Sequence, residues 1–135
     1  MNNLKIKLLL ISLLFFNTVM AQDMWKYFTP DDFAKRRAKV MEQIGDGIAI
    51  LRGAELPEAY VKFRQDNNFY YLTGVEIPGA ILIMNGKSKE TLLLVPDRNS
   101  GDIKKEAHIV VGEDAAKMYK VNAVLSATMF TNILT

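Results

Sequence analysis

Two apolar runs joined by a turn sequence constrain the fold of this chain more than any other feature. The runs are Ala80 to Met84 and Thr91 to Val95, and Asn85-Gly86 follows the first of them. Asn-Gly between apolar runs is a strong short-range signal for an antiparallel hairpin, because both residues tolerate positive φ. The sequence therefore predicts two paired strands, joined either by a two-residue turn or by a longer one that extends to Lys89.

A helix is predicted well before the hairpin. Thr29 to Asp32 supply an N-cap, a proline at the first helical position and two acids at the positive end of the helix dipole. Gly45 supplies a left-handed C-terminal position. Between them, apolar residues at helical spacing predict one buried stripe: Phe33, Val40, Met41 and Ile44.

Two more strands are predicted between this helix and the hairpin. The apolar run Ile48 to Leu51 is typical of a strand buried on both faces, so Ile50→Asp is expected to be severe. The run Phe69 to Thr73 is rich in the aromatic residues that favour strands, and Gly74 closes it. The sequence thus predicts a mixed sheet with the Pro30 to Ile44 helix on one face.

The C-terminal third continues the alternation of helix and strand. Glu113 to Tyr119 is predicted to be a short helix and Val121 to Leu125 a short strand. Ser126 is the expected N-cap of a last helix, whose apolar face would hold Met129, Phe130, Ile133 and Leu134. The fold class is therefore α/β, a single domain with a mixed β-sheet flanked by helices.

The N-terminal segment, residues 1–21, has the three-part pattern of a secretory signal peptide. Lys5 and Lys7 precede an apolar run, and small residues at Val19 and Ala21 fit a cleavage site before Gln22. The alternative is an uncleaved anchor helix. It is disfavoured because a membrane-spanning helix needs about 20 apolar residues, and the apolar run here is far shorter. We therefore expect a periplasmic or secreted protein whose mature domain is 22–135.

Charge and cysteine content exclude several classes of protein. Lys5 and Lys7 are the only charged residues of the expected signal peptide, so the 17 basic residues fall to 15 in the mature part, equal to the 15 acidic ones. A nucleic-acid partner is not expected. The basic cluster Lys35-Arg36-Arg37 is predicted on the solvated side of the first helix. There is no cysteine, which excludes disulfides and thiolate metal sites.

No catalytic constellation can be identified in the sequence. His108 is the only histidine, so none lies at metal-ligand spacing from it. The acid pairs Asp31-Asp32 and Glu113-Asp114 stand at helix starts, where they interact with the dipole. Gly45-Asp46-Gly47 lacks the third glycine and the helix start of a dinucleotide-binding loop. We therefore assign no catalytic and no metal-ligating residue.

The run from Phe63 to Gly74, FRQDNNFYYLTG, resembles the N-terminal domain shared by aminopeptidase P, prolidase and creatinase, and is most similar to aminopeptidase P. Phe33 to Arg37, Ile77 to Ala80 and Gly112 to Ala116 resemble other parts of the same domain. Between Arg98 and Gly112 the sequence departs from the family pattern, since Glu106, Ala107 and His108 stand where related domains often have tryptophan and more glycine.

This resemblance implies a creatinase/aminopeptidase P N-terminal-domain-like fold in a metalloaminopeptidase acting on peptides with proline in the second position. It implies that a second domain holds two divalent metal ions, usually manganese, and that this chain binds none. The resemblance also implies a homo-oligomer in which the N-terminal domain borders the catalytic pocket of a neighbouring subunit. Arg64 and Tyr71 would contact substrate there. For Arg64 and Tyr71, the alternative is a purely structural role within their own domain. For the whole chain, the alternative is a stand-alone exported interaction module without peptidase activity.

Overall fold

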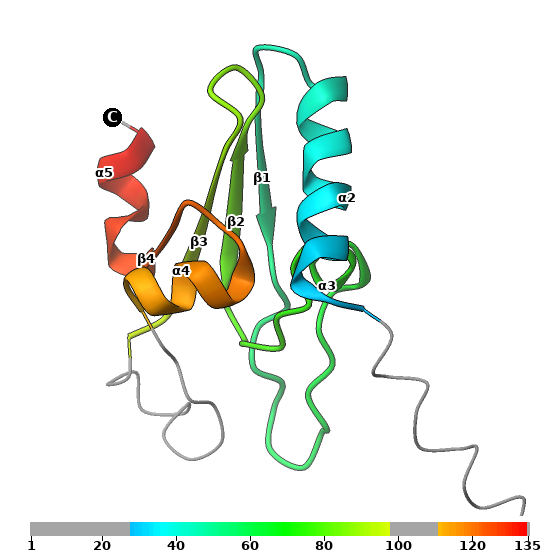
Figure 1. Ribbon diagram of the computed structural model, residues 1–135. Helices are drawn as coiled ribbons and strands as arrows, with labels where there is room; N and C mark the ends of the chain where they lie inside the picture. The colour runs from blue at the N-terminus through cyan, green and yellow to red at the C-terminus, as the bar shows by residue number, and fades with distance from the viewer. Residues whose placement is uncertain (1–27, 98–110, 135) are drawn as a thin grey trace, which may run out of the picture.

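The predicted hairpin forms the centre of a four-stranded sheet (Figure 1). In the computed structural model, which describes residues 28–97 and 111–134, β2 (Ile81–Asn85) pairs antiparallel with β3 (Glu90–Val95). The Oδ1 atom of Asn85 accepts hydrogen bonds from the backbone N–H groups of Lys87 (3.0 Å) and Ser88 (3.1 Å). Lys89 ends the turn with a φ of 59°. The longer of the two turns is therefore present.

The two outer strands make the sheet mixed. β1 (Ile48–Arg52) runs antiparallel to β2, and β4 (Ala123–Ser126) runs parallel to β3, so the strand order is β1-β2-β3-β4. This confirms the predicted α/β fold with a mixed sheet. β4 begins two residues later than the predicted Val121 to Leu125.

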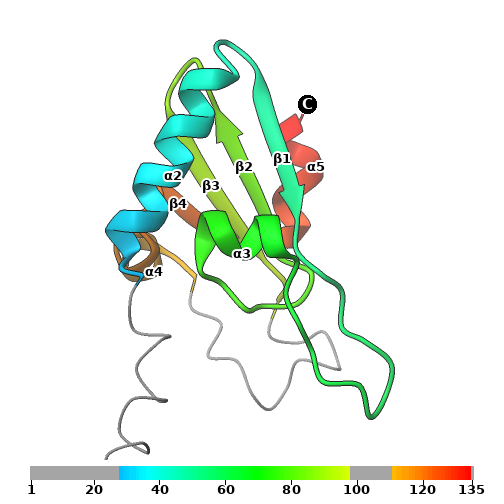
Figure 2. The same cartoon turned by 90° about the vertical axis from the view of Figure 1, so that its right-hand side faces the viewer.

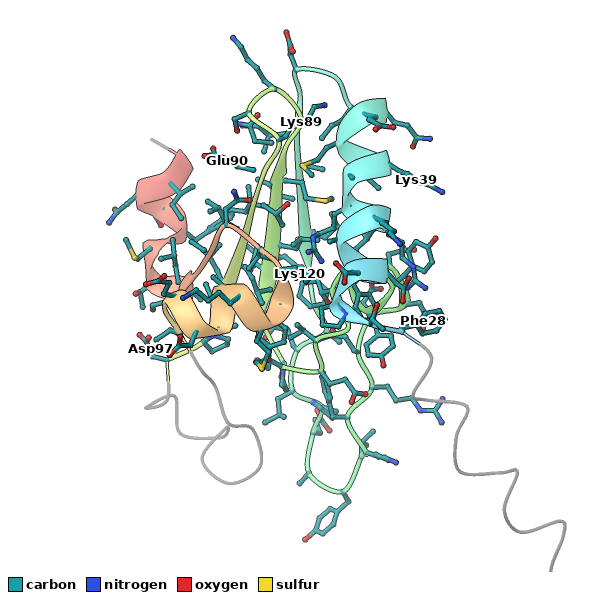
Figure 3. The ribbon with its side chains drawn as sticks, in the orientation of Figure 1. Phe28, Lys39, Lys89, Glu90, Asp97 and Lys120 are labelled. Atoms are coloured by element: carbon teal, nitrogen blue, oxygen red, sulfur yellow. The ribbon has the colours of Figure 1, made fainter. Side chains whose placement is uncertain are left out.

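Helix α2 (Pro30–Gln43) begins at the predicted Pro30 and ends one residue before the predicted Ile44, which is its C-cap. The carboxylate of Asp32 accepts hydrogen bonds from the backbone N–H (2.8 Å) and the hydroxyl (2.9 Å) of Thr29. Gly45 follows the helix with a φ of 58°. At the same end, Lys89 Nζ donates to the carbonyl oxygen of Met41 over 2.9 Å, which ties the hairpin turn to α2 (Figure 3).

Helices cover the two faces of the sheet unequally (Figures 1 and 2). On one face, α2, α3 (Asn67–Thr73) and α4 (Glu113–Tyr119) enclose the larger core. On the other, a 3-10 turn η1 (Ala127–Met129) and helix α5 (Phe130–Leu134) pack Phe130 and Ile133 over a smaller cluster. The larger core is formed mainly by Met41, Phe69, Leu72, Leu82, Met84, Leu93, Val95 and Val124.

The prediction of a strand at Phe69 to Thr73 is wrong, because this segment is helix α3 (Asn67–Thr73). The Oδ1 atom of Asp66 accepts a hydrogen bond from the N–H of Phe69 over 2.9 Å and caps the helix start. Gly74 ends the helix with a φ of 67°. The two caps, with only seven residues between them, outweigh the strand preference of the aromatic residues in that run.

The prediction that Ile48 to Leu51 is buried on both faces is also wrong. β1 is the edge strand, and its residues alternate between exposed and half-buried. Ile48 is 58% exposed and Ile50 is 41% exposed, whereas Ala49 and Leu51 pack against the larger core. Apolar composition alone does not distinguish an edge strand from a central one, since the difference depends on strand order.

The C-terminal elements agree closely with the sequence. The predicted helix at Glu113 to Tyr119 is confirmed as α4. Ser126 Oγ accepts a hydrogen bond from the N–H of Thr128 over 3.2 Å, which confirms Ser126 as a cap. Phe130 and Ile133 face the smaller cluster, but Met129 is 42% exposed and does not join them. No helix of the described residues is long and apolar enough to span a membrane.

Candidate functional site

Gln65 joins the two chain segments that flank helix α3. Its Oε1 atom accepts hydrogen bonds from the backbone N–H groups of Ala54 (2.6 Å) and Asp66 (2.9 Å). Its Nε2 atom donates to the carbonyl oxygens of Val75 (3.2 Å) and Ile77 (3.0 Å). The amide therefore uses both its donors and both its acceptor sites. It fixes the loop before α3 against the segment after it.

Arg37 lies buried where three helices meet, with only 2% of its surface exposed. It donates to the carbonyl oxygen of Leu72 (2.8 Å) in α3, and to those of Tyr119 (3.1 Å) and Lys120 (2.6 Å) at the end of α4. Carbonyl groups at helix C-termini carry partial negative charge, which suits a guanidinium. Burial lowers the pKa of Arg37 to about 10, so the group is still charged at neutral pH. The prediction that Arg37 is solvated is wrong.

A salt bridge on the surface reinforces this junction. Lys120, which follows α4 in a left-handed conformation, forms an ion pair with Asp31 in the first turn of α2 (Figure 3). Asp31 thus sits at a helix start, as its acid pair predicts. α2 is held to α4 by both a buried and an exposed basic residue.

Arg36 lies among three aromatic rings, those of Phe28, Phe33 and Tyr71. We call these four residues the aromatic cluster. The Cζ atom of Arg36 lies 4.3 Å from the ring centroids of both Phe28 and Tyr71, and 5.2 Å from that of Phe33. Its Nη1 atom also donates to the carbonyl oxygen of Tyr71 over 2.9 Å. Arg36 therefore holds Tyr71 in two ways, by a cation–π contact with the tyrosine ring and by a hydrogen bond to the tyrosine carbonyl.

Gly74 allows Phe33 to pack against the end of α3. A Cβ atom at Gly74 would lie 2.4 Å from Cε2 of Phe33, and the φ of 67° is also unfavourable for a side chain. The ring of Phe33 makes an edge contact with Tyr70, with centroids 6.4 Å apart. The glycine that ends the helix is thus also the contact point between α2 and α3.

The two residues for which the resemblance implies substrate contact are both at the surface. Arg64 is exposed in the segment that leads into α3, and Tyr71 is 56% exposed on α3. No hydrogen bond or ring contact found among the described residues joins them. The guanidinium over Tyr71 belongs to Arg36, a contact that the sequence does not predict. The spacing of Phe28, Arg36 and Tyr71 gives no local signal, since α2 and α3 meet only in the folded chain.

The described residues provide no metal site. Within 28–97 and 111–134, no group of three or more His, Cys, Asp or Glu side chains is placed to hold a metal ion. Glu113 and Asp114 lie in the first turn of α4, in agreement with their predicted dipole role. Between Arg98 and Gly112 the sequence departs from the family pattern. Residues 98–110 of this stretch, which include His108, lie outside the described residues.

Comparison with known families decides the relationship. A family model described as "Aminopeptidase P, N-terminal domain" matches residues 33–135. The chain belongs to this family. The match includes the aromatic cluster from Phe33 onward, Gln65, and the whole run from Phe63 to Gly74 on which the resemblance rests. The sequence-based expectation of an aminopeptidase P N-terminal domain is therefore confirmed.

Relatives of this aminopeptidase P domain are much longer proteins. A probable Xaa-Pro aminopeptidase of Uncinocarpus reesii is 31% identical over 103 residues, which cover 70% of this chain and 21% of the relative. One from Coccidioides posadasii is 32% identical over 89 residues, covering 62% of this chain and 19% of the relative. The chain thus spans about a fifth of the length of the curated relatives it matches.

Solved structures show the same fold. A variant of Escherichia coli aminopeptidase P has a TM-score of 0.67 at 22% identity, covering 79% of this chain and 26% of that one. Icp55 from Saccharomyces cerevisiae has a TM-score of 0.66 at 21% identity, covering 78% of this chain and 26% of that one. The aminopeptidase P N-terminal domain therefore accounts for most of this chain and about a quarter of each neighbour.

Proposed function

We propose that this chain is the non-catalytic N-terminal domain of an exported Xaa-Pro aminopeptidase. The single observation that carries the proposal is the family match over residues 33–135, in a region that makes up about a fifth of the relatives' length. A two-metal hydrolytic centre needs several carboxylates and usually a histidine. The described residues bring no such set together, so they fit no metal. The metal ions, expected to be manganese, belong in this proposal to a catalytic domain elsewhere in the polypeptide.

The proposed contribution of the domain is to shape the substrate pocket of a neighbouring subunit in a homo-oligomer. Arg64 would bind a carboxylate of a proline-containing peptide, because its planar guanidinium offers two parallel donors. Tyr71 would form a wall of the pocket. Two features support these roles: both side chains are exposed, and Arg36 holds the Tyr71 ring in a fixed position. A rigid aromatic wall costs little ordering when substrate binds.

Export is proposed from residues 1–21, which lie outside the described residues. Cleavage after Ala21 would leave Gln22 as the mature N-terminus and remove Lys5 and Lys7. Mass spectrometry of the protein recovered from the periplasm or the medium decides this. Recovery of a mature chain that still contains Met1 to Ala21 would contradict the cleavage site.

The experiment that tests the catalytic assignment uses the chain alone. Purified chain, supplied with manganese or zinc, is expected not to release the first residue from a peptide with proline in second position. A full-length aminopeptidase P assayed in parallel serves as the positive control. Metal-dependent release by the chain, abolished by a chelator and absent from a mock purification, would overturn the proposal.

The pocket role is tested in the full-length gene product, if the coding region continues with a catalytic domain. Arg64→Ala should lower turnover of the peptide by about tenfold or more without changing the bound metal content, since the proposed role is a charge-assisted contact. Lys62→Ala is the matched control, because Lys62 is an exposed basic residue in the same segment. Equal effects of the two changes would reject a specific role for Arg64. A coding region without metal-ligand residues would favour the stand-alone module instead.

A further inference from the structure

We propose that the open edge of strand β1 pairs with β1 of a second copy of this chain, antiparallel and across a twofold axis at Ile50. The inference specifies the oligomer contact of the proposed function, but it stands on the geometry of β1 alone. Its tests measure association and not hydrolysis, so its failure is distinct from failure of the peptidase assignment.

The phase of the hydrogen-bond ladder shows which groups of β1 are free. β1 pairs with β2 in unbroken register from Ile48 opposite Asn85 to Arg52 opposite Ile81. In an antiparallel pair, residues that exchange hydrogen bonds alternate with residues that point their N–H and C=O groups away. Two backbone hydrogen bonds at the ends of the strand show which residues belong to each set. The N–H of Gly53 donates to the carbonyl oxygen of Ala80 (2.7 Å), and the N–H of Gly86 donates to that of Gly47 (2.9 Å).

It follows that the odd-numbered residues of β1 bond to β2. The backbone N–H and C=O groups of Ile48, Ile50 and Arg52 therefore point to the open edge. In the strand order β1-β2-β3-β4, no further strand of the described residues lies beyond β1. Figure 2 shows β1 at the margin of the sheet, with α5 behind it.

This set of outward groups is self-complementary. A twofold axis at Ile50 places Ile50 opposite its own copy, and Ile48 opposite Arg52 of the second chain. All three residues present outward donors and acceptors, so each opposed pair can exchange two hydrogen bonds, roughly six in all. A shift of one residue would oppose outward groups to inward ones, and a shift of two would lose an end pair. One register is therefore clearly best.

The side chains favour the same contact. Ile48 is 58% exposed and Ile50 is 41% exposed, and pairing would place the two copies of Ile50 next to each other. Edge strands are usually protected by proline, lysine, inward charge or a bulge. β1, with the sequence IAILR and a continuous register, has none of these. Its last residue, Arg52, lies over the ring of Phe130 at 5.4 Å, which leaves Ile48 and Ile50 as the uncovered part.

The first test uses the absence of cysteine from the chain. Ile50→Cys should form an intermolecular disulfide rapidly under mild oxidation, because Cα atoms of a hydrogen-bonded pair lie about 5.5 Å apart, within the about 4.4 to 6.8 Å that a disulfide spans. Tyr60→Cys is the control, since Tyr60 is 108% exposed and would cross-link faster if only collisions mattered. Cross-linking at position 50 no faster than at position 60 would overturn the proposal.

The second test concerns register. Ile48→Cys and Arg52→Cys chains should each cross-link slowly alone and at least about tenfold faster when mixed, since position 48 lies opposite position 52 only in the proposed pairing. Mass spectrometry of the mixed product identifies the linked peptides. Fast cross-linking of either variant by itself, without gain on mixing, would exclude this register.

The third test measures association of the full exported chain by sedimentation up to about 1 mM, a range that covers weak contacts. The parent chain should dimerise, and Ile50→Lys should raise the dissociation constant by about tenfold or more, because two like charges would face each other. Met118→Lys adds the same charge at a 49% exposed site on α4 and should not change it. A parent chain that stays monomeric would overturn the proposal and would leave the edge of β1 to a strand of another polypeptide. An unchanged dissociation constant for Ile50→Lys would also overturn it.

Discussion

The guanidinium of Arg37 donates a hydrogen bond to the carbonyl oxygen of Leu72 over 2.8 Å, although the two residues are 35 positions apart in the chain. The same group reaches Tyr119 and Lys120, which are 82 and 83 positions away. One side chain of α2 therefore joins the C-terminal ends of α3 and α4. The surface that carries Tyr71 depends on this junction, because α3 rests on α2 through it.

Arg37→Met should destabilise the domain by about 3 kcal/mol or more, because it leaves buried carbonyl groups without a donor. Urea unfolding followed by circular dichroism measures the change. Lys35→Met is the control, since Lys35 is exposed on the same helix and its loss should matter by less than about 0.5 kcal/mol. Similar midpoints for the two variants would show that the Arg37 bonds are not needed.

Gly74→Ala should destabilise by about 2 to 4 kcal/mol, for two reasons that can be separated. The left-handed conformation costs about 1 kcal/mol with a side chain, and the clash with Phe33 adds the cost of overpacking. Gly45→Ala is the matched control, because Gly45 has a φ of 58° but nothing within 4 Å of its added Cβ. The two variants should differ by about 1 to 3 kcal/mol in unfolding free energy. A difference near zero would mean that Phe33 can move aside.

The elements that the sequence predicts correctly are those with local signals. The start of α2 depends on Thr29 and Asp32, three positions apart, and the hairpin turn depends on Asn85. The helix at Glu113 to Tyr119 is likewise local. The sequence-based prediction of a strand at α3 is wrong although both caps of the helix, Asp66 and Gly74, are visible in the sequence. A run of seven residues between an N-cap and a glycine fits one short helix better than a strand.

What the sequence cannot predict depends on residues far apart in the chain. The edge position of β1 follows from the order in which strands assemble, so the burial of Ile50 could not be read from its own segment. The aromatic cluster forms because α2 and α3 meet, which places Arg36 over Tyr71. The family resemblance indicated Tyr71 but gave no hint of the residue that holds it.

Ile50→Asp provides a test of the edge position. The sequence alone predicts severe destabilisation, whereas the structure predicts a loss of about 1 kcal/mol or less at concentrations where the chain is monomeric, because the side chain reaches water. Ile83→Asp should lose several kcal/mol, since Ile83 lies opposite Ile50 in β2 but is only 5% exposed. Thermal unfolding of both variants decides it. Equal and severe losses would place Ile50 inside a two-sided core.

Gln65→Glu tests the four-bond role of the Gln65 amide. At neutral pH the new carboxylate would place an oxygen where Nε2 now donates to the carbonyls of Val75 and Ile77, so the loss should be about 2 kcal/mol or more. Protonation restores one donor, and the loss should shrink at acid pH. Gln43→Glu, an exposed change at the last residue of α2, should show only the smaller loss, of less than about 1 kcal/mol, that a carboxylate causes at the negative end of a helix dipole. A loss at Gln65 that does not depend on pH would contradict the proposed geometry.

Asp32 predicts a specific pH dependence of stability. Hydrogen bonds from the backbone N–H and the hydroxyl of Thr29 lower the pKa of its carboxyl from the ordinary value of 3.8. A carboxyl whose pKa is lower in the folded than in the unfolded chain stabilises the fold fully above the unfolded value, and this contribution disappears as pH falls through the folded value. Asp32→Asn should therefore unfold at a lower temperature than the parent near pH 7.

The difference between the parent and Asp32→Asn should close as the pH is lowered below 3.8, because the parent then carries a neutral carboxyl as well. Thermal unfolding at several pH values between neutral and about 2 measures it. Glu58→Gln, which removes an exposed acid from the loop after β1, is the control and should leave the parent's profile nearly unchanged. If Asp32→Asn kept the same offset at every pH, the charge of Asp32 would not be what stabilises the start of α2.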